Sequence, residues 1–184
     1  MELTNRNPNE HQIIEGCVHS KTWAQKLVYE QYSSIMMGVC VRYASDRETA
    51  RDLLQDGFIK VFSNIKTYTG TGSFGGWIRR IFVTTALEYL RKNDALKQST
   101  SIDYYDYSIE NMDVSILDKI SADELMQCIE KLPTGYRTVF NLYAIEGYSH
   151  LEIAKMLHIS ENTSRSQFMR ARKMLQKSVQ TLNN

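Results

Sequence analysis

Side chains that could contact nucleic acid gather in the last quarter of the chain. The segment from Arg165 to Lys177 contains five cations and neither Asp nor Glu. A helix that is merely solvated normally mixes both signs of charge, so the imbalance favours an anionic partner. At helical spacing, the outward positions are Arg165, Ser166, Met169, Arg170 and Lys173. A basic helix with hydrogen-bonding side chains fits the DNA major groove, where base edges are distinguishable.

A preceding short helix and a tight turn are predicted to hold the basic helix in place. Ser149 and Glu152 have the spacing of a capping box, which predicts a helix that begins directly after Ser149. A turn over residues 157–159 follows, and Ser160 can cap the next helix. The positions expected to face inward are Ile153, Ala154, Leu157, Ser164, Phe168, Ala171 and Leu175. The pattern predicts a helix-turn-helix, and a helical hairpin with a solvated basic face is the alternative.

A glycine-rich loop over residues 68–76 precedes a segment that interleaves aromatic residues with arginines. The loop lacks the Gly-Lys-Ser/Thr ending of a nucleotide-binding loop and follows no predicted strand, which disfavours a phosphate-binding loop. Aromatic and cationic side chains together are suited to stacking unpaired bases while neutralising phosphates. Taken singly, Trp77 and Phe82 are more simply explained as core residues.

A third surface lies on the helix predicted after Asp46, a residue that can cap it. Its inward positions recur every three or four residues: Ala50, Leu54, Phe58, Val61 and Ile65. The other side carries Asp52, Gln55, Asp56 and Lys60, which the pattern alone interprets as solvated surface. The preceding stretch, residues 11–43, is amphipathic, with expected core positions at Ile14, Leu27, Tyr32, Ile35, Met36, Val39 and Val41.

Composition predicts a helical protein of the cytoplasm. The 184 residues are 42% apolar, include two prolines and show few strand-like alternations. No stretch approaches the roughly 20 apolar residues that a bilayer requires, and the first ten residues lack the apolar core of a secretion signal. Cys17, Cys40 and Cys128 are expected as buried thiols, and no metal site is expected from them or from the four histidines. Residues 94–119 lose helical periodicity and predict a linker, either mobile or docked through its tyrosines.

Two blocks of sequence resemble one known family. The first block comprises residues 52–62, Phe74-x-x-Trp77-Ile78-x-Arg80-Ile81 and Ala86-x-x-Tyr89-Leu90-Arg91. The second comprises Leu132-Pro133, Arg137, Val139-Phe140, Glu146-Gly147-Tyr148-Ser149, Glu152-Ile153-Ala154, Ile159-Ser160-Glu161 and Arg170-Ala171-Arg172. The blocks resemble regions 2 and 4 of the extracytoplasmic-function (ECF) group of bacterial sigma-70 factors. The resemblance implies an all-α fold of two small helical domains, residues 1–93 and 120–184, joined by a flexible linker over residues 94–119.

The resemblance also implies a role for each surface. The residues implied to bind core RNA polymerase are Asp52, Gln55, Asp56 and Phe58. Those implied to contact the minus-10 element are Tyr68, Trp77, Arg79, Arg80 and Thr84. Those implied to contact the minus-35 element are Arg137, Thr163, Arg165, Ser166, Met169, Arg170 and Lys173, with Arg137 on a phosphate.

The function implied is that of an initiation factor, with core RNA polymerase, promoter DNA and an anti-sigma factor as partners. No catalysis, cofactor or small-molecule substrate is expected. A helix-turn-helix regulator that acts without core polymerase is the first alternative, and a helical adaptor with no role on DNA is the second. Several departures from the family keep base preference from being carried over. Thr84 stands where Asn is frequent, the loop over residues 68–76 holds more glycine than usual, and Asn162 and Ser164 replace a common Gly and Val. An inward serine should loosen the packing unless its hydroxyl bonds back to a carbonyl.

Overall fold

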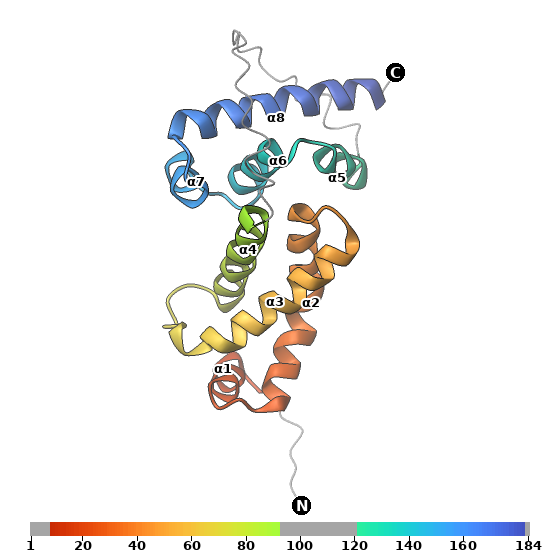
Figure 1. The fold of residues 1–184 in the computed structure, drawn as a ribbon. Helices are drawn as coiled ribbons and strands as arrows, with labels where there is room; N and C mark the ends of the chain where they lie inside the picture. Colours follow the sequence, from red (N-terminus) through yellow and green to blue (C-terminus); the bar gives the residue numbers. More distant parts are fainter. Residues whose placement is uncertain (1–7, 93–120, 183–184) are drawn as a thin grey trace, which may run out of the picture. The chain divides into compact units, whose positions relative to one another are not determined.

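The computed structural model describes residues 8–92 and 121–182, which form helices joined by turns and contain no strand in these two ranges (Figure 1). The expected all-α class is confirmed. The chain divides into two compact units, Met1–Tyr89 (unit 1) and Leu90–Asn184 (unit 2). The linker predicted over residues 94–119 lies outside the described residues, so the proposed domain boundaries stay a prediction.

Unit 1 begins with a short helix and a long one. These are α1 (Glu10–Val18) and α2 (Thr22–Tyr43), which pack against each other. The sequence pattern treated residues 11–43 as one stretch, but the chain turns at Ser20, whose φ is +54°. The two helices approach closely because Gly16 has no side chain: a Cβ atom there would lie 2.6 Å from the Cβ of Ala24.

The next helices of unit 1 are α3 (Arg47–Asn64), a 3₁₀ turn η1 (Ile65–Thr67) and α4 (Phe74–Lys92). Asp46 caps α3 as predicted, since its Oδ1 accepts a hydrogen bond from the Thr49 backbone at 2.8 Å, and this bond lowers the pKa of the Asp46 carboxyl. All five inward positions predicted for α3 are buried: Ala50, Leu54, Phe58, Val61 and Ile65. The rings of Phe58 and Phe82 meet edge to face at 5.2 Å and join α3 to α4.

The core positions expected on α1 and α2 are only partly correct. Tyr32, Met36 and Val39 are buried, whereas Ile14, Leu27 and Val41 are half-buried. Ile35 is 55% exposed, so its assignment to the core is wrong. Its position on α2 lies just outside the stripe that faces α3.

Unit 2 contains α5 (Ala122–Glu130), α6 (Thr134–Phe140), a π-helical turn η4 (Asn141–Ile145), α7 (His150–Leu157) and α8 (Glu161–Leu182). Ser121 and Glu124 form a capping box at the start of α5. The helix α8 packs against α5, α6 and α7. One core cluster of buried residues joins α5 to α8: Cys128, Ile129, Leu132, Ala171, Leu175 and Val179.

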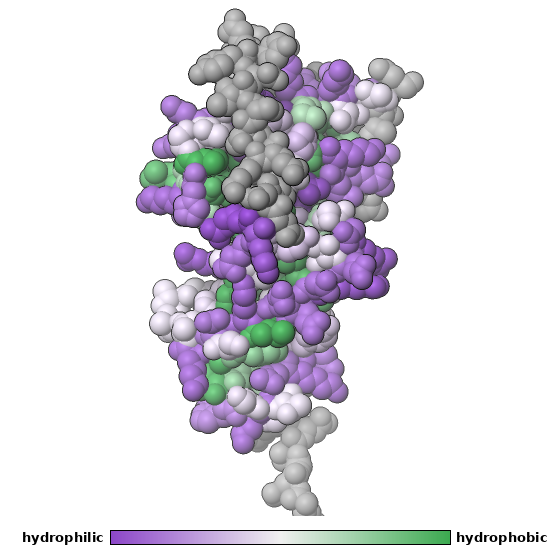
Figure 2. All heavy atoms as spheres, in the orientation of Figure 1, coloured by the Kyte–Doolittle hydropathy of each residue, from purple (hydrophilic) through white to green (hydrophobic). Residues whose placement is uncertain are grey.

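The surface is mainly hydrophilic on the face drawn in Figure 2, where apolar residues appear as separate patches. The large apolar side chains exposed in unit 1 are Trp23, Tyr29, Ile35 and Ile59. Cys17, Cys40 and Cys128 are buried free thiols, as expected, and burial raises the pKa of Cys40 to about 12. Within residues 8–92 and 121–182, no helix combines the length and the apolar character needed to cross a bilayer.

Candidate nucleic-acid interfaces

Helices α7 and α8 form the predicted helix-turn-helix. The Ser149 Oγ accepts from the Glu152 backbone at 3.3 Å, and the Glu152 carboxylate accepts from the Ser149 backbone at 2.8 Å, so the predicted capping box is confirmed. His158 ends α7 in the left-handed conformation, with φ +54° and ψ +44°. Ser160 then caps α8 by accepting from the Thr163 backbone at 3.0 Å.

A buried polar pair fixes how α7 and α8 pack. His150 Nδ1 lies 2.9 Å from the Ser164 Oγ, and both residues are buried. The Tyr143 ring stacks on the imidazole with centroids 4.3 Å apart. Burial lowers the pKa of His150, nearby Arg165 lowers it further, and Glu161 opposes the shift. The sequence predicted looser packing at Ser164 unless its hydroxyl bonded back to a carbonyl, but the hydroxyl instead pairs with a side chain of the facing helix. The core position of this serine was the signal that a polar partner must exist.

The predicted DNA-facing side chains of α8 do not all share one environment. Arg165 and Lys173 are exposed, and Arg165 Nη2 pairs with Glu161 Oε1 at 2.5 Å. Thr163, Ser166 and Met169 are half-buried, and the Ser166 hydroxyl donates to the Thr163 carbonyl at 3.0 Å. The outer face of α8 thus offers two exposed cations with shorter side chains between them.

Two of the residues predicted to contact DNA also make contacts within unit 2. Arg170 Nη1 donates to the Tyr136 hydroxyl at 3.2 Å and its guanidinium lies 5.9 Å from the centre of that ring, so the prediction that Arg170 points outward is wrong. Arg137 Nη1 donates to the Glu130 carbonyl at 2.9 Å and so caps the end of α5. Burial lowers the pKa of the Arg137 guanidinium, although Glu130 counteracts this. Gln167, buried at 6% exposure, was not foreseen as an inward residue.

In unit 1, Tyr68 closes the glycine-rich loop. Its hydroxyl donates to the Gly72 carbonyl at 2.9 Å, and its ring packs against Phe74 at 5.2 Å and Trp77 at 5.5 Å. Gly70 and Gly72 have φ of +77° and +78°, a region that favours glycine. Tyr68, which was expected to contact DNA, therefore stabilises the conformation of the loop through these contacts.

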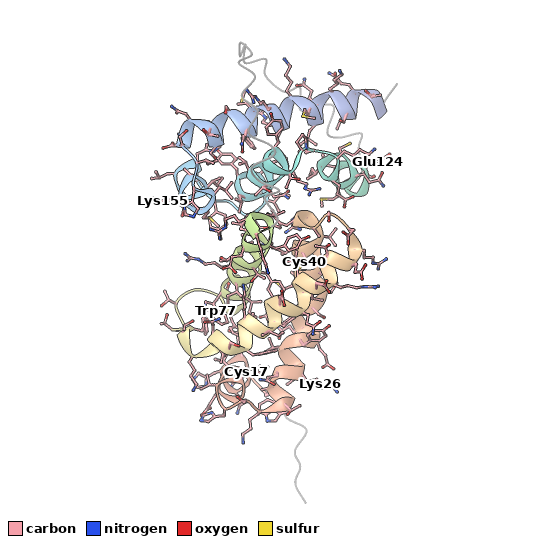
Figure 3. All side chains as sticks on the ribbon, in the orientation of Figure 1. Cys17, Lys26, Cys40, Trp77, Glu124 and Lys155 are labelled. Carbon is pink, nitrogen blue, oxygen red and sulfur yellow. The ribbon has the colours of Figure 1, made fainter. Side chains whose placement is uncertain are left out.

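Beside this loop, the end of α3 and one side of α4, from Trp77 to Glu88, line an open groove of about 390 Å³. Its lining residues are Lys60, Asn64, Trp77, Arg80, Ile81, Thr84, Thr85 and Glu88. Trp77, labelled in Figure 3, is half-buried, and Arg80 and Thr84 are exposed. Arg79 does not line the groove. It lies two positions after Trp77 on α4, which places it near the opposite side of that helix. Lys60, Asn64 and Glu88 were missed as members of this site.

The acidic and amide residues of α3 form a separate exposed surface. Asp52, Gln55 and Asp56 are all exposed, as their position opposite the core requires. Phe58 is not part of this surface: it is 4% exposed and packs among other rings, which corrects its assignment as a direct polymerase contact. Ile59 is 56% exposed on the same helix, and sequence reasoning missed it.

Two family models match the chain in this order. "Sigma-70 region 2" matches residues 28–96, and "Sigma-70, region 4" matches residues 122–175. Each match contains one of the surfaces described above: the α3–α4 region lies in the first, and the helix-turn-helix in the second.

Curated relatives align over nearly the whole chain. The RNA polymerase sigma-H factor of Pseudomonas aeruginosa is 27% identical over an alignment of 184 positions, which covers 94% of this chain and 95% of that protein. The ECF RNA polymerase sigma-E factor of Haemophilus influenzae is 28% identical over 180 residues, which cover 92% of this chain and 95% of that protein.

Solved structures share the fold. The sigma factor RpoE of Bartonella quintana, crystallised with the anti-sigma factor NepR, has a TM-score of 0.53 at 17% identity, over 84% of this chain and 96% of that one. CnrH, in complex with the cytosolic domain of CnrY, has a TM-score of 0.51 at 18% identity, over 92% of this chain and 96% of that one. Because both sigma regions occur in order and the relatives span the same length, the chain belongs to the ECF group of the sigma-70 family of RNA polymerase sigma factors.

Proposed function

We propose that this sigma factor binds core RNA polymerase through the exposed face of α3. The surface comprises Asp52, Gln55 and Asp56, with Ile59 at its edge. An apolar side chain beside acids and an amide suits a protein interface, in which an apolar contact is ringed by polar ones. Phe58 supports this face from beneath, within the core.

We also propose that α8 reads the minus-35 element in the major groove. The helix-turn-helix exposes Arg165 and Lys173, places Ser166 and Met169 between them, and has Thr163 one position before Ser164. Arg165 is the candidate for a base contact because a guanidinium pairs well with guanine edges. Arg137 and Arg170, which contact their own unit, retain at most a positioning role on phosphates.

The minus-10 element is proposed to be engaged by the glycine-rich loop and by α4 through Tyr68, Trp77, Arg80 and Thr84. The single observation that carries the function is the presence of both sigma regions, each with its exposed candidate surface, in one chain. The protein is proposed to act in the cytoplasm, to catalyse no reaction itself and to use no cofactor. The likeness in fold to a sigma factor crystallised with an anti-sigma factor supports the proposal that such a protein also binds this chain.

The test of the polymerase surface is a charge reversal. Asp52→Arg with Asp56→Arg should abolish co-elution with core RNA polymerase and run-off transcription, because like charges would then face the partner's docking site. The control, Glu15→Arg with Glu30→Arg, makes the same change in net charge on exposed positions of α1 and α2. Core binding that survives the first pair, or fails equally in the second, would reject the assignment. A helix-turn-helix regulator acting without polymerase would show neither co-elution nor run-off even with the unaltered chain.

A further inference from the structure

A second open groove lies in unit 1, where the chain turns from α1 into α2 (Figure 1). Its volume is about 530 Å³, within the roughly 300–1,000 Å³ typical of ligand sites. Its lining residues are Pro8, Gln12, Glu15, Gly16, His19, Lys21 and Trp23. All of them precede Ala24, so this groove shares no residue with the surfaces proposed to contact polymerase or DNA.

One side of α1 forms the floor of this groove. Gln12, Glu15 and His19 follow helical spacings of three and four residues, so they lie in a row. His19 Nδ1 lies 2.9 Å from the Glu15 carbonyl oxygen and donates to it, because a carbonyl can only accept. This bond fixes the imidazole and leaves Nε2 to face a ligand. Gln12 Oε1 accepts from the Asn9 backbone at 3.0 Å, so the Gln12 amide hydrogens remain as donors.

Trp23 supplies an aromatic wall. The edge of its ring rests on α1 at Gly16, where a Cβ atom would lie only 3.0 Å from Trp23 Cζ2. The residue is nevertheless 47% exposed, so much of the indole surface stays open. A flat ring held in this way offers a surface on which another ring can stack at little cost in side-chain entropy.

The groove also carries two exposed groups of opposite charge, the Glu15 carboxylate and the Lys21 ammonium. Within residues 8–92 and 121–182, neither side chain forms an ion pair. Glu15 can only accept hydrogen bonds and Lys21 can only donate them. A ligand that satisfies the groove therefore combines a flat ring, hydrogen-bond donors and an anionic group.

These three features occur together in a guanine mononucleotide. The Watson–Crick edge of guanine presents two adjacent donors, N1–H and the exocyclic amine, which match the two oxygens of a carboxylate. Adenine lacks this pair of donors. The phosphate is the anion that Lys21 and the fixed imidazole of His19 suit. A basic peptide is another ligand that an exposed indole beside a carboxylate attracts, but Lys21 repels it.

We propose that the groove between α1 and α2 binds a free guanine mononucleotide. The base stacks on Trp23, its two donors bond to Glu15, and its phosphate contacts Lys21. This site goes beyond the proposed function, because it needs neither core polymerase nor promoter DNA. Since the nucleotide binds only the folded chain, it also stabilises unit 1 against unfolding.

The test measures the fluorescence of Trp23 in the full chain with Trp77→Phe, which leaves Trp23 as the single tryptophan. GMP should quench it with a dissociation constant of about 0.1–1 mM, as expected for an open groove that leaves part of the ligand in water. AMP should bind about 3–10-fold more weakly, because it lacks the donors for Glu15. Inorganic phosphate alone should leave the fluorescence unchanged. Calorimetry on the unaltered chain should give the same constants, independently of the Trp77 substitution.

Two variants separate the contacts to the base from the contacts to the phosphate. Glu15→Gln should remove the preference for GMP over AMP, because an amide offers one acceptor in place of two. Lys21→Ala should weaken both nucleotides about 3–10-fold and keep their ratio, because the phosphate is common to both. The control pair lies on α2, where Lys26 Nζ and Glu30 Oε1 are 3.7 Å apart. Lys26→Ala and Glu30→Gln should leave both affinities unchanged.

The proposal is overturned if GMP and AMP bind the unaltered chain equally, if calorimetry detects no binding up to about 10 mM, or if the control pair gives the same shifts. Tighter binding of a guanine-containing single-stranded oligonucleotide, per nucleotide, would assign the groove to a nucleic acid strand and also overturn it. Co-elution with core polymerase contains no nucleotide, so its failure would reject the proposed function alone.

Discussion

Two parts of the molecule share one local plan, a short helix, a tight turn and a 22-residue helix. In unit 1 these are α1 and α2, and in unit 2 they are α7 and α8. Each turn contains a non-glycine residue with φ of +54°, Ser20 in the first and His158 in the second. The long helices differ in charge: α2 has two cations and one acid, whereas α8 has five cations and one acid. The same turn geometry therefore precedes two helices of different charge, and the excess of cations on α8 is what suits that helix to the proposed contact with DNA.

The two helix pairs are also held together differently. In unit 1, Gly16 lets α1 pack closely against Ala24 and Trp23. In unit 2, a hydrogen bond between the buried side chains of His150 and Ser164 joins the two helices. The crossing of α1 and α2 depends on the absence of a side chain, and the crossing of α7 and α8 depends on a directional hydrogen bond. Different kinds of substitution should therefore destabilise the two crossings.

The largest effect is expected for Gly16→Val. A Cβ would lie 2.6 Å from the Ala24 Cβ, so the helices must move apart, and we expect the free energy of unfolding of unit 1 to fall by about 3 kcal/mol. Fluorescence during urea unfolding reports this unit, because both tryptophans of the chain, Trp23 and Trp77, lie in it. The control Gly38→Ala, with no atom nearer to its Cβ than Arg42 Nη1 at 4.0 Å, should stabilise by about 0.5–1 kcal/mol. Equal effects at the two glycines would contradict the close crossing.

Ser164→Val should have the next largest effect. It removes the hydrogen-bond partner of buried His150, which costs about 2 kcal/mol in the unfolding of unit 2, followed by circular dichroism. Adding His150→Phe should recover most of the loss, because both polar partners are then replaced together. A stabilising Ser164→Val would show that the packing of α7 and α8 does not use this bond.

Arg165 and Arg170 should respond differently to truncation. Arg165→Ala should weaken binding to the preferred upstream element about tenfold, or about 1.4 kcal/mol, relax preference at one base position and leave stability unchanged. Arg170→Ala should lower stability by about 1 kcal/mol, because it loses the Tyr136 contact, and weaken all sequences alike. Binding to a library of upstream elements checks both. A relaxed base preference in Arg170→Ala would show instead that Arg170 contacts a base.

Stability of unit 2 should also depend on pH through His150. Its pKa is lowered in the folded protein, chiefly by burial, so below about pH 6.5 the unfolded chain binds more protons than the folded one. The contribution is complete above pH 6.5 and is lost as pH falls toward the folded pKa, with a slope of at most about 1.4 kcal/mol per unit for one proton. Urea unfolding between pH 7.5 and 5.5 measures it, and His150→Gln should flatten the curve. The same slope in both proteins would assign the effect to another group.

The smallest effects are expected for substitutions at the two turns that contain Ser20 and His158. His158→Gly and Ser20→Gly should each stabilise their unit by about 0.5–1 kcal/mol, because glycine adopts positive φ without the steric cost that other residues bear. Thermal unfolding of each variant measures the gain. Destabilisation at only one turn would reveal side-chain contacts that make the two turns unequal.

Local chemistry explains what the sequence could predict. Asp46, Ser149 and Ser160 cap their helices as expected, because each hydroxyl or carboxylate needs only a backbone amide three residues ahead. The turn at Ser20 and the burial of His150 escaped prediction, since both depend on partners across a helix crossing. Arg170 was misplaced for a similar reason: its wheel position borders the α6 side, where Tyr136 attracts a guanidinium. The groove between α3 and α4 was predicted only in part, because its lining residues come from two helices. Sequence periodicity describes one helix at a time and does not show which faces of two helices meet.

The closed loop between η1 and α4 has a consequence for how such factors diverge. At Gly70 and Gly72 the backbone conformation excludes most side chains, whereas Thr69 and Thr71 are exposed, and their hydroxyls bond to each other. Ser73 is also exposed, but its Oγ accepts from the Gly76 backbone and caps α4. After gene duplication, a copy that changes Thr69 and Thr71 would keep its fold and still present a new loop surface. Through the proposed contact of this loop with the minus-10 element, such a copy could come to use new promoters by single substitutions. Each variant along the way would still fold.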